Sequence, residues 1–553
     1  MDNSGWNMYV FRAGRKTISG NTLRNRLVHS LHLYFENPAE DTCIAALIAA
    51  GELECAFADV ISDSADSESV GAVNITDRIA ESLVTASFFD ANDLLAAATS
   101  LQLPDALQLS VAEGFAYYAL HPQKFIDLAR TLSPLQSARV IGLRSIGTTL
   151  SAVFCAALRA RGVAAERITV RPHGHPYERQ FSFNEREVCW LRSSASEPHV
   201  FVVDEGPGIS GSSFLSVAEA AEHAGVSRDR IWMLGSRWPD PALLRAPNAA
   251  DRWSRYHFRA VDPAPVLPSA AAIDLGGGSW RSAFPPDCRP AIWSQLESAK
   301  YMSVDGRRRF KFHGYGHYGE TIAARAANLA ASGFAPPLLA LEKGFGVYDF
   351  IPGRSLTPSD ISPELLHRLA EYCAFRAREF RSDEISPELS TMAAWNWQCE
   401  FGAALAPPLT LDVQTCVVTD SRMLPHEWLR ADDGRILKFD AVSHGDDHFF
   451  PGPCDIAWDL AGAVIEFRMD TAPTVAFLAH YQHLSGNDPR DRLPDYLLAY
   501  SVFRMAWSKM ASQSCAGTPD EILLRRDYLH YRSTAQQLAE SRTAHRQIAH
   551  SAD

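Results

Sequence analysis

The sequence lacks several features that would place it in a class at once. Its longest unbroken apolar run is Cys43 to Ala50, far short of the roughly 18 residues needed to cross a bilayer. The opening MDNSGWNMYVFRAGRK has no charged stretch followed by an apolar one, so no secretory signal is indicated. None of the ten cysteines forms a CxxC pair, which argues against a zinc ribbon or a dense disulfide framework. We therefore expect a cytoplasmic protein without membrane segments.

An excess of positive charge is also lacking. The chain has 52 basic and 65 acidic residues, a formal net charge of −13, which disfavours broad binding to nucleic acid or to an anionic membrane. With 46% hydrophobic and 21% charged residues, the composition is that of a globular protein. Its 553 residues predict three or four domains at roughly 150 residues each. Small molecules are the expected partners.

The texture of the chain changes along its length and predicts an α/β plus α+β protein. Residues 1–110 form a mainly helical N-terminal region, whereas in 111–245 short apolar runs (RVIGL, ITV, HVFVVD) alternate with helical segments, as in a parallel sheet. Residues 246–291 are rich in proline and are expected to be a linker, including its Gly276-Gly277-Gly278 run. In 292–553 a hairpin and a helix precede a largely helical remainder, a bilobal pattern. We expect the halves to fold separately, so that cutting near Pro268 gives two soluble pieces.

A possible phosphate site follows the apolar strand of the segment FVVDEGPGISGSSF. The strand ends at Asp204 and Glu205, and a loop rich in glycine and serine leads into a helix. Glycines let backbone N–H groups approach an anion, and a helix N-terminus favours one. The acidic pair suits ribose hydroxyls or Mg²⁺. The alternative is an ordinary strand-to-helix turn with a capping serine.

This segment resembles the type I phosphoribosyltransferase family, which carries an acidic pair and a serine- or threonine-rich phosphate loop. The upstream VIGLRSIGTTLSAV resembles that family's pyrophosphate loop, and Arg171 and Arg179 occupy the place of its mobile hood loop. The resemblance implies binding of phosphoribosyl diphosphate (PRPP) with Mg²⁺, and Arg144 would neutralise the diphosphate. The implied PRPP-binding residues are Arg144, Ser145, Gly147, Asp204, Glu205, Gly208, Ser210, Gly211, Ser212 and Ser213.

A second group of acidic residues lies in the stretch from Thr415 to Ala463. A strand-like CVV precedes Asp420, and after a hairpin a second strand, RILKF, precedes Asp440. Two carboxylates at the ends of neighbouring strands can divide the work of deprotonating a hydroxyl and holding Mg²⁺ on a nucleotide. The nearby His444–His448 segment has ligand types that suit a divalent ion, but we favour a polar loop beside the cleft.

This region resembles the aminoglycoside-phosphotransferase-like branch of the protein-kinase superfamily. The resemblance makes Asp420 the catalytic aspartate and Asp440 the metal ligand, with Asp455 and Asp459 on the helix that follows. Position 425, where the family keeps a metal-binding asparagine, is proline, so His426 or Glu427 would supply the second metal contact. The implied ATP-binding residues are Lys311 and Glu320.

Together these segments predict a bifunctional transferase. PRPP-dependent phosphoribosyl transfer, or its reverse, would be coupled to ATP-dependent phosphorylation of a small nucleoside-like metabolite, with Mg²⁺ as the metal. The alternative, motivated by the missing asparagine, is a regulatory protein that binds PRPP or nucleotide without turnover.

Overall fold

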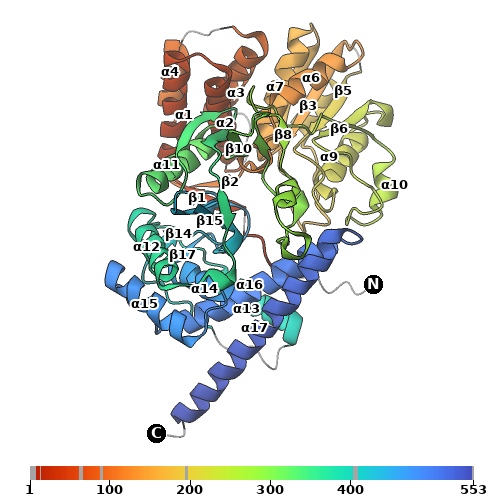
Figure 1. Ribbon diagram of the computed structural model, residues 1–553. Coiled ribbons are helices and arrows are strands. Elements are labelled where there is room, and N and C mark those ends of the chain that lie inside the picture. The colour runs from red at the N-terminus through yellow and green to blue at the C-terminus, as the bar shows by residue number, and fades with distance from the viewer. Residues whose placement is uncertain are drawn as a thin grey trace.

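The computed structural model describes residues 8–12, 14–60, 67–87, 91–193, 197–402 and 409–550. Figure 1 shows the N-terminal helices and a sheet with helices at one end, a second sheet in the middle, and a helical lobe at the other end. Within the described ranges no helix combines the length and the apolar character that crossing a membrane requires. All ten cysteines are free thiols.

The N-terminal region is a group of helices closed by a short β-ribbon. Strand β1 (Arg15–Ile18) pairs antiparallel with β2 (Leu107–Ser110). Helix α2 is buried along most of its length because its neighbours and α7 of the next unit surround it. The four helices between the strands are α1 (Gly20–Glu36), α2 (Glu40–Ala58), α3 (Ser67–Thr85) and α4 (Ala91–Ser100).

The next unit is built on a five-stranded parallel sheet. Its spatial order is β4-β3-β5-β6-β7, so the order reverses between β3 and β5, where open α/β sheets bind ligands at the carboxyl ends of the strands. Successive side chains of β3 point to opposite faces of the sheet, so Val140 belongs to one hydrophobic core and Ile141 to the other. The strands are β3 (Ser137–Leu143), β4 (Ala164–Val170), β5 (His199–Val203), β6 (Ile231–Gly235) and β7 (His257–Ala260).

Helices cover both faces of this sheet. One face packs against α6 (Gln123–Thr131) and α7 (Ile146–Ala160), whose apolar residues share a core with α2. The other face packs against α8 (Glu185–Arg192), α9 (Ser212–His223) and α10 (Ala249–Trp253). Short α5 (Glu113–Ala116) lies before α6 and contacts α7.

The linker expected over residues 246–291 is much shorter in the structure. Helix α10 and strand β7 belong to the parallel unit, and β8 (Ile273–Asp274) pairs with the next sheet. Helix α10 and strands β7 and β8 have at most five residues each, too few to show a helical or strand periodicity in the sequence. The prolines nearby therefore suggested a linker. The connecting segment between the two sheets is therefore 261–272.

The second sheet is antiparallel, with the order β11-β12-β10-β9-β8. Strands β9 and β10 form the expected hairpin, and Gly306 supplies the positive φ of 70° that its turn requires. Helix α11 (His317–Ala331) connects β10 to β11 and packs against β11 and β12. The longer strands are β9 (Lys300–Met302), β10 (Arg308–Phe312), β11 (Leu338–Glu342) and β12 (Phe345–Asp349).

The C-terminal lobe is mainly helical and holds two small sheets. In one, β13 (Gly353–Ser355), β15 (Trp428–Ala431) and β16 (Ile436–Lys438) pair in that order; in the other, β14 (Cys416–Val418) pairs with β17 (Pro453–Asp455). The helices are α12 (Pro363–Glu379), α13 (Leu389–Phe401), α14 (Ala457–Glu466), α15 (Thr471–Ser485), α16 (Leu493–Ser514) and α17 (Pro519–His550).

The two halves share a hydrophobic core. Phe310 and Phe312 of β10 belong to the same buried cluster as Leu47 of α2 and Leu150 of α7. Backbone hydrogen bonds also connect the two halves. The first described residues pack on the C-terminal lobe, where the Tyr9 N–H donates to the Asn396 side-chain oxygen at 2.6 Å. This shared core argues against the separate folding that the proline-rich segment alone predicts.

Candidate functional sites

The first candidate site is the crevice between the carboxyl ends of β3 and β5. Asp204 and Glu205 follow β5, and Ser145 and Gly147 begin the turn from β3 into α7. The two loops touch: a Cβ added to Gly147 would lie 2.6 Å from the Val203 carbonyl oxygen, so only glycine fits there. The expected acidic pair and the expected pyrophosphate loop thus face one another across the switch point of the sheet.

The two acids of this crevice are poorly solvated and lack cationic partners. Burial raises the pKa of Asp204 to about 7, even though the Arg171 charge draws it down. Burial, and then the charges of Glu113 and Asp204, raise the pKa of Glu205 to about 8. Glu205 accepts the Gly114 N–H at 2.8 Å, but no described residue forms an ion pair with either acid. Uncompensated acids of this kind suit hydroxyl groups or a divalent cation.

Several arginines gather beside the crevice around one carboxylate. Asp59, just after α2, pairs with Arg171 at 2.6 Å, with Arg144 at 3.3 Å and with Arg15 at 3.7 Å. The expected role of Arg144 as a free diphosphate ligand does not fit this arrangement, because its guanidinium also donates to the carbonyl oxygens of Ala58 and Thr169. The cluster nevertheless has more positive than negative charge, and its excess is available to an anion.

The expected phosphate loop and the expected hood loop contact each other. The hydroxyls of Ser210 and Ser212 both donate to the Pro176 carbonyl oxygen, at 2.8 and 2.7 Å. Arg179 of the same hood segment donates to Gly174, and burial together with the charges of Arg15 and Arg171 lowers its pKa. Binding a phosphate at the two serines would require these hydroxyls to exchange one acceptor for another.

The rest of that loop is open. Gly208 has a φ of +57° and no heavy atom within 4 Å of an added Cβ. Gly211 precedes α9 in the left-handed region and has no side chain with which to cap the helix, while the Ser210 hydroxyl accepts the Ser212 N–H at 3.2 Å. Ser213 lies in its first turn, where N–H groups have no intrahelical partner.

The second candidate site lies between the antiparallel sheet and the C-terminal lobe. Phe310 and Phe312 face the core, so the intervening Lys311 points to the other side of β10, where its ammonium donates to Asp440 and, at 3.1 Å, to Ser443. Lys300 on β9 also pairs with Asp440, at 3.3 Å. Burial alone would raise the pKa of Asp440, but the two lysines hold it well below its usual range. Two cations and one acid from distant segments therefore meet in this cleft.

Glu320 is not the partner of Lys311. It is exposed in the first turn of α11, and the ion pair of Lys311 is with Asp440. The helix position that the resemblance assigned to an acid points away from the cleft, and Asp440 and Glu297 balance the two lysines.

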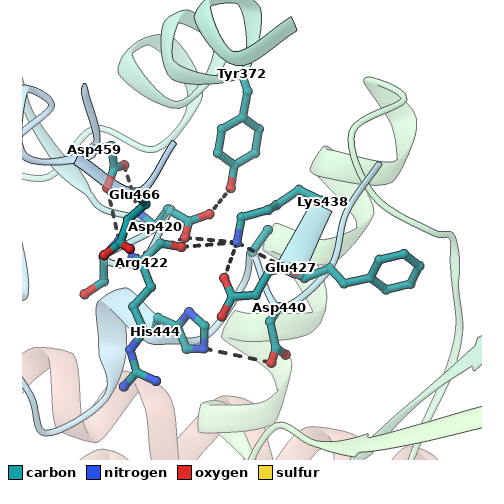
Figure 2. Close-up of polar contacts among 12 residues, drawn as sticks. Tyr372, Asp420, Arg422, Glu427, Lys438, Asp440, His444, Asp459 and Glu466 are labelled. Carbon is teal, nitrogen blue, oxygen red and sulfur yellow. Dashed lines mark hydrogen bonds and ion pairs between the residues drawn. The ribbon is translucent and has the colours of Figure 1, made fainter. Parts of the chain in front are cut away.

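Asp420 is fully buried and does not line the cleft. Its carboxylate accepts the Tyr372 hydroxyl of α12 and pairs with Lys438 at 3.2 Å, as Figure 2 shows. The backbone at Asp420 is also held in place, because the Asp459 carboxylate accepts the N–H groups of Asp420 and Ser421 at 2.8 and 3.0 Å. The direct contact with a substrate hydroxyl expected of Asp420 is therefore not available in this conformation.

Asp455 and Asp459 are structural supports. Asp459 pairs with Arg376 at 3.4 Å and is fully buried. Asp455 accepts the N–H groups of Gln414 and Thr415 and pairs with Arg492 at 2.8 Å. Both carboxylates thus hold loops in place.

The residues that could hold a metal differ from those expected. Asp420, Glu427 and His444 offer ligand atoms that all lie within 4.8 Å of one another. His426 is not among them; its ring stacks on Trp280 with centroids 5.7 Å apart, and burial lowers its pKa to about 3. His444 comes from the segment that we took for a polar loop. Glu427, expected as the alternative to His426 for the second metal contact, does belong to this group.

The run Gly276-Gly277-Gly278, expected to be part of the linker, lies between two residues that line this cleft, Leu275 and Trp280. Gly276 to Gly278 connect β8 to the segment leading into β9, and Trp280 lines the cavity beside Lys300. Glu297 accepts the Gly278 N–H at 2.7 Å and the Trp280 ring N–H at 2.6 Å, which holds the loop over the lysines.

The cavity of the second candidate site extends toward the first. Its volume is about 1560 Å³, and its lining includes Lys300, Lys311 and Asp440 at one end. It also reaches Arg15 of the arginine cluster and Glu113, the neighbour of the glycine that holds Glu205. Residues from the N-terminal region, the parallel unit and the C-terminal lobe therefore line a common space.

No protein-family model matches the chain, and no curated protein matches it. Solved structures similar to part of the chain are kinases and phosphotransferases. An ethanolamine kinase from Plasmodium vivax is 11% identical over 43% of this chain and 81% of its own, with a TM-score of 0.29. A choline kinase from Streptococcus pneumoniae is 14% identical over 43% and 89%, with a TM-score of 0.29.

An aminoglycoside phosphotransferase from Alicyclobacillus acidocaldarius is 12% identical over 52% of this chain and 98% of its own, with a TM-score of 0.30. None of these three is a phosphoribosyltransferase. The resemblance of residues 111–245 to that family therefore rests on its motifs and on the geometry of the crevice.

Proposed function

We propose that the C-terminal half is an ATP- and Mg²⁺-dependent phosphotransferase that acts on a hydroxyl group of a small molecule. The observation that carries this proposal is the convergence of Lys300, Lys311 and Asp440 on one cavity. Two ammonium groups suit the phosphates of a nucleotide, and a carboxylate that stays ionised suits a divalent cation.

The residues fit magnesium at Asp440. Its carboxylate is 20% exposed, lines the cavity and remains anionic at any ordinary pH. Magnesium bound there would neutralise charge on the phosphates during transfer. Lys311 and Lys300 would then turn from Asp440 to phosphate oxygens, and the loop of Trp280 would exclude water from them.

Glu427 is the acid best placed to contact an acceptor hydroxyl. It lines the cavity, whereas Asp420 beside it is buried. Burial and the neighbouring aspartates raise its pKa, although Lys438 donates to it. A carboxylate with a raised pKa is a better proton acceptor near neutral pH. Asp420 would act indirectly, by fixing Lys438 and the loop.

A binding titration and an ATP-consumption assay test this half. Lys311→Met and Asp440→Asn should each lose Mg·ATP affinity in calorimetry, whereas Lys343→Met and Asp433→Asn, which change residues outside the cavity, should not. Wild-type protein that binds no nucleotide would refute the proposal. Screening hydroxyl-bearing metabolites for ATP consumption then identifies the acceptor.

Nucleotide binding without turnover is the second candidate function. The burial of Asp420, whose family position is the catalytic aspartate, favours it. Tight Mg·ATP binding with no phosphate transfer to any acceptor, and no change in Glu427→Gln, would identify this regulatory role.

We further propose that the parallel unit binds PRPP with Mg²⁺ and transfers its phosphoribosyl group. The support is the unpaired Asp204 and Glu205 at the switch point, with the arginine cluster and the glycine-serine loop on either side. Asp204→Asn with Glu205→Gln should abolish Mg-dependent PRPP affinity in calorimetry. The exposed Asp229→Asn on the same unit is the matched control.

The common cavity supports coupling of the two activities. A ribosylated product that left the crevice near Arg15 and Glu113 would enter the cavity that Lys311 and Asp440 line. This makes a nucleoside-like molecule the acceptor to test first.

A further inference from the structure

A buried ammonium group lies among oxygen atoms in the C-terminal lobe. Lys438, the last residue of β16, has a fully buried side chain. Its Nζ lies 2.6 Å from Glu427 Oε2 and 3.2 Å from Asp420 Oδ1. The carbonyl oxygens of Arg422 and Phe439 lie at 3.3 Å each. Figure 2 shows this nitrogen at the centre of the group.

The oxygen atoms around Lys438 resemble the donor set of a hard cation. Two carboxylates and two carbonyls converge from different segments, and an ammonium has only three N–H groups to share among them. Asp420 and Glu427, with His444, also form the group in the described residues whose ligand atoms are close enough for one metal ion. His444 Nδ1 is buried and has no hydrogen-bond partner, so it is available as a ligand.

A divalent cation cannot enter this group while Lys438 is present. Lys438 is fully buried and held by four oxygen atoms, so its ammonium cannot turn away as those of Lys300 and Lys311 would, and it would lie within a few ångströms of the positive metal ion. The Lys438 Nζ is enclosed by two carboxylates and two carbonyl oxygens, so it occupies the space that a metal ion would need. The position that follows Asp420 by five residues, Pro425, supplies no side-chain ligand either. A second metal ion therefore does not fit here, whereas Asp440 faces the open cavity.

We propose that Lys438 is a built-in cation that takes the place of a second metal ion, so that the C-terminal half uses one divalent cation, held by Asp440. Its ammonium neutralises Asp420 and Glu427 and fixes the loop between them. Asp420 is then held for charge balance and positioning, which explains why the carboxylate is buried. The prediction of one metal ion per nucleotide rests on the proposed ATP site. The arrangement of oxygen atoms around the Lys438 ammonium does not depend on that proposal.

Counting bound Mn²⁺ by electron paramagnetic resonance tests this proposal without any measurement of activity. Without nucleotide, Lys438→Ala and Lys438→Gln should each gain one Mn²⁺ site that the wild type lacks, and Mn²⁺ should raise their melting temperatures. Adding Glu427→Gln to either variant should remove the gained site. Lys509→Ala is the matched control, because it also removes an ammonium from a nearly buried acid, Glu400, which belongs to no group of three metal-capable side chains among the described residues.

The outcomes separate this inference from the proposed function. A variant that folds only when Mn²⁺ is present supports the inference, because metal then replaces the ammonium. If neither variant gains a Mn²⁺ site, or if the wild type binds two Mn²⁺ ions with nucleotide, Lys438 is not a substitute for a metal. If the wild type binds no nucleotide but the variants gain Mn²⁺, the phosphotransferase proposal fails and the built-in cation stands.

Discussion

The acidic pair of the parallel sheet allows a quantitative test of the crevice. Asp204 and Glu205 are uncompensated, and their pKa values rise from 3.8 to about 7 and from 4.5 to about 8. Between the unfolded and the folded pKa values the folded state binds more protons, so these two acids make stability fall as pH rises from about 4 to about 8. Each pKa unit corresponds to about 1.4 kcal/mol, or roughly 4 kcal/mol for Asp204 taken alone.

The double variant Asp204→Asn, Glu205→Gln should remove this pH dependence. Because the two acids repel each other and both are partly exposed, their shifts cannot simply be added, and we expect a gain of at least about 2 kcal/mol at pH 8.5. At pH 4 the variant and the wild type should differ little. Hydrogen exchange of peptides from 137–143 and 199–203, followed by mass spectrometry at several pH values, measures the local stability of β3 and β5. Parallel pH profiles for the two proteins would refute the reasoning.

Three further predictions follow from packing. Gly147→Ala should destabilise the parallel unit by about 1–3 kcal/mol in urea titrations and abolish PRPP affinity, because its Cβ would collide with the Val203 carbonyl. Asp459→Ala should lower the free energy of unfolding by about 3–5 kcal/mol, because the buried Arg376 loses its ion pair with Asp459 and two backbone N–H groups lose their acceptor. The exposed Asp433→Ala should change the free energy of unfolding by less than about 0.5 kcal/mol. Fragments 1–267 and 268–553 should each aggregate when expressed alone and remain soluble when expressed together, as gel filtration would show; two soluble separate fragments would contradict the shared core.

Local patterns predicted the framework but not the pairing of charged groups. The parallel sheet and the hairpin at Gly306 are visible in the sequence because strand and turn signals are local. Lys311 and Asp440 could be assigned to one cleft only through a family resemblance, since 129 residues separate them. Lys300 and Lys438 carried no signal at all, because a lysine in a strand is ordinarily exposed.

Errors arose where burial decides the role of a residue. Asp420 was expected to face a substrate, but Tyr372 and Lys438 enclose its carboxylate. Arg144 was expected to be free for an anion, but Asp59, from a region whose sequence indicated no function, holds its guanidinium. Motif spacing gives the positions of ionisable groups along the chain, whereas their partners come from segments that fold next to them.

The N-terminal region links the two candidate sites physically. Asp59 at the end of α2 orders the arginines of the crevice, while Glu52, two turns earlier on the same helix, accepts hydrogen bonds from His317 and Tyr318 at the start of α11. Glu52 is buried, and the charges of His317 and Arg26 lower its pKa to about 2 against the effect of burial, so the contact persists across the physiological pH range. Helix α11 begins five residues after the end of the strand that carries Lys311, so α2 contacts both the arginine cluster of the first site and the helix that follows the lysine strand of the second.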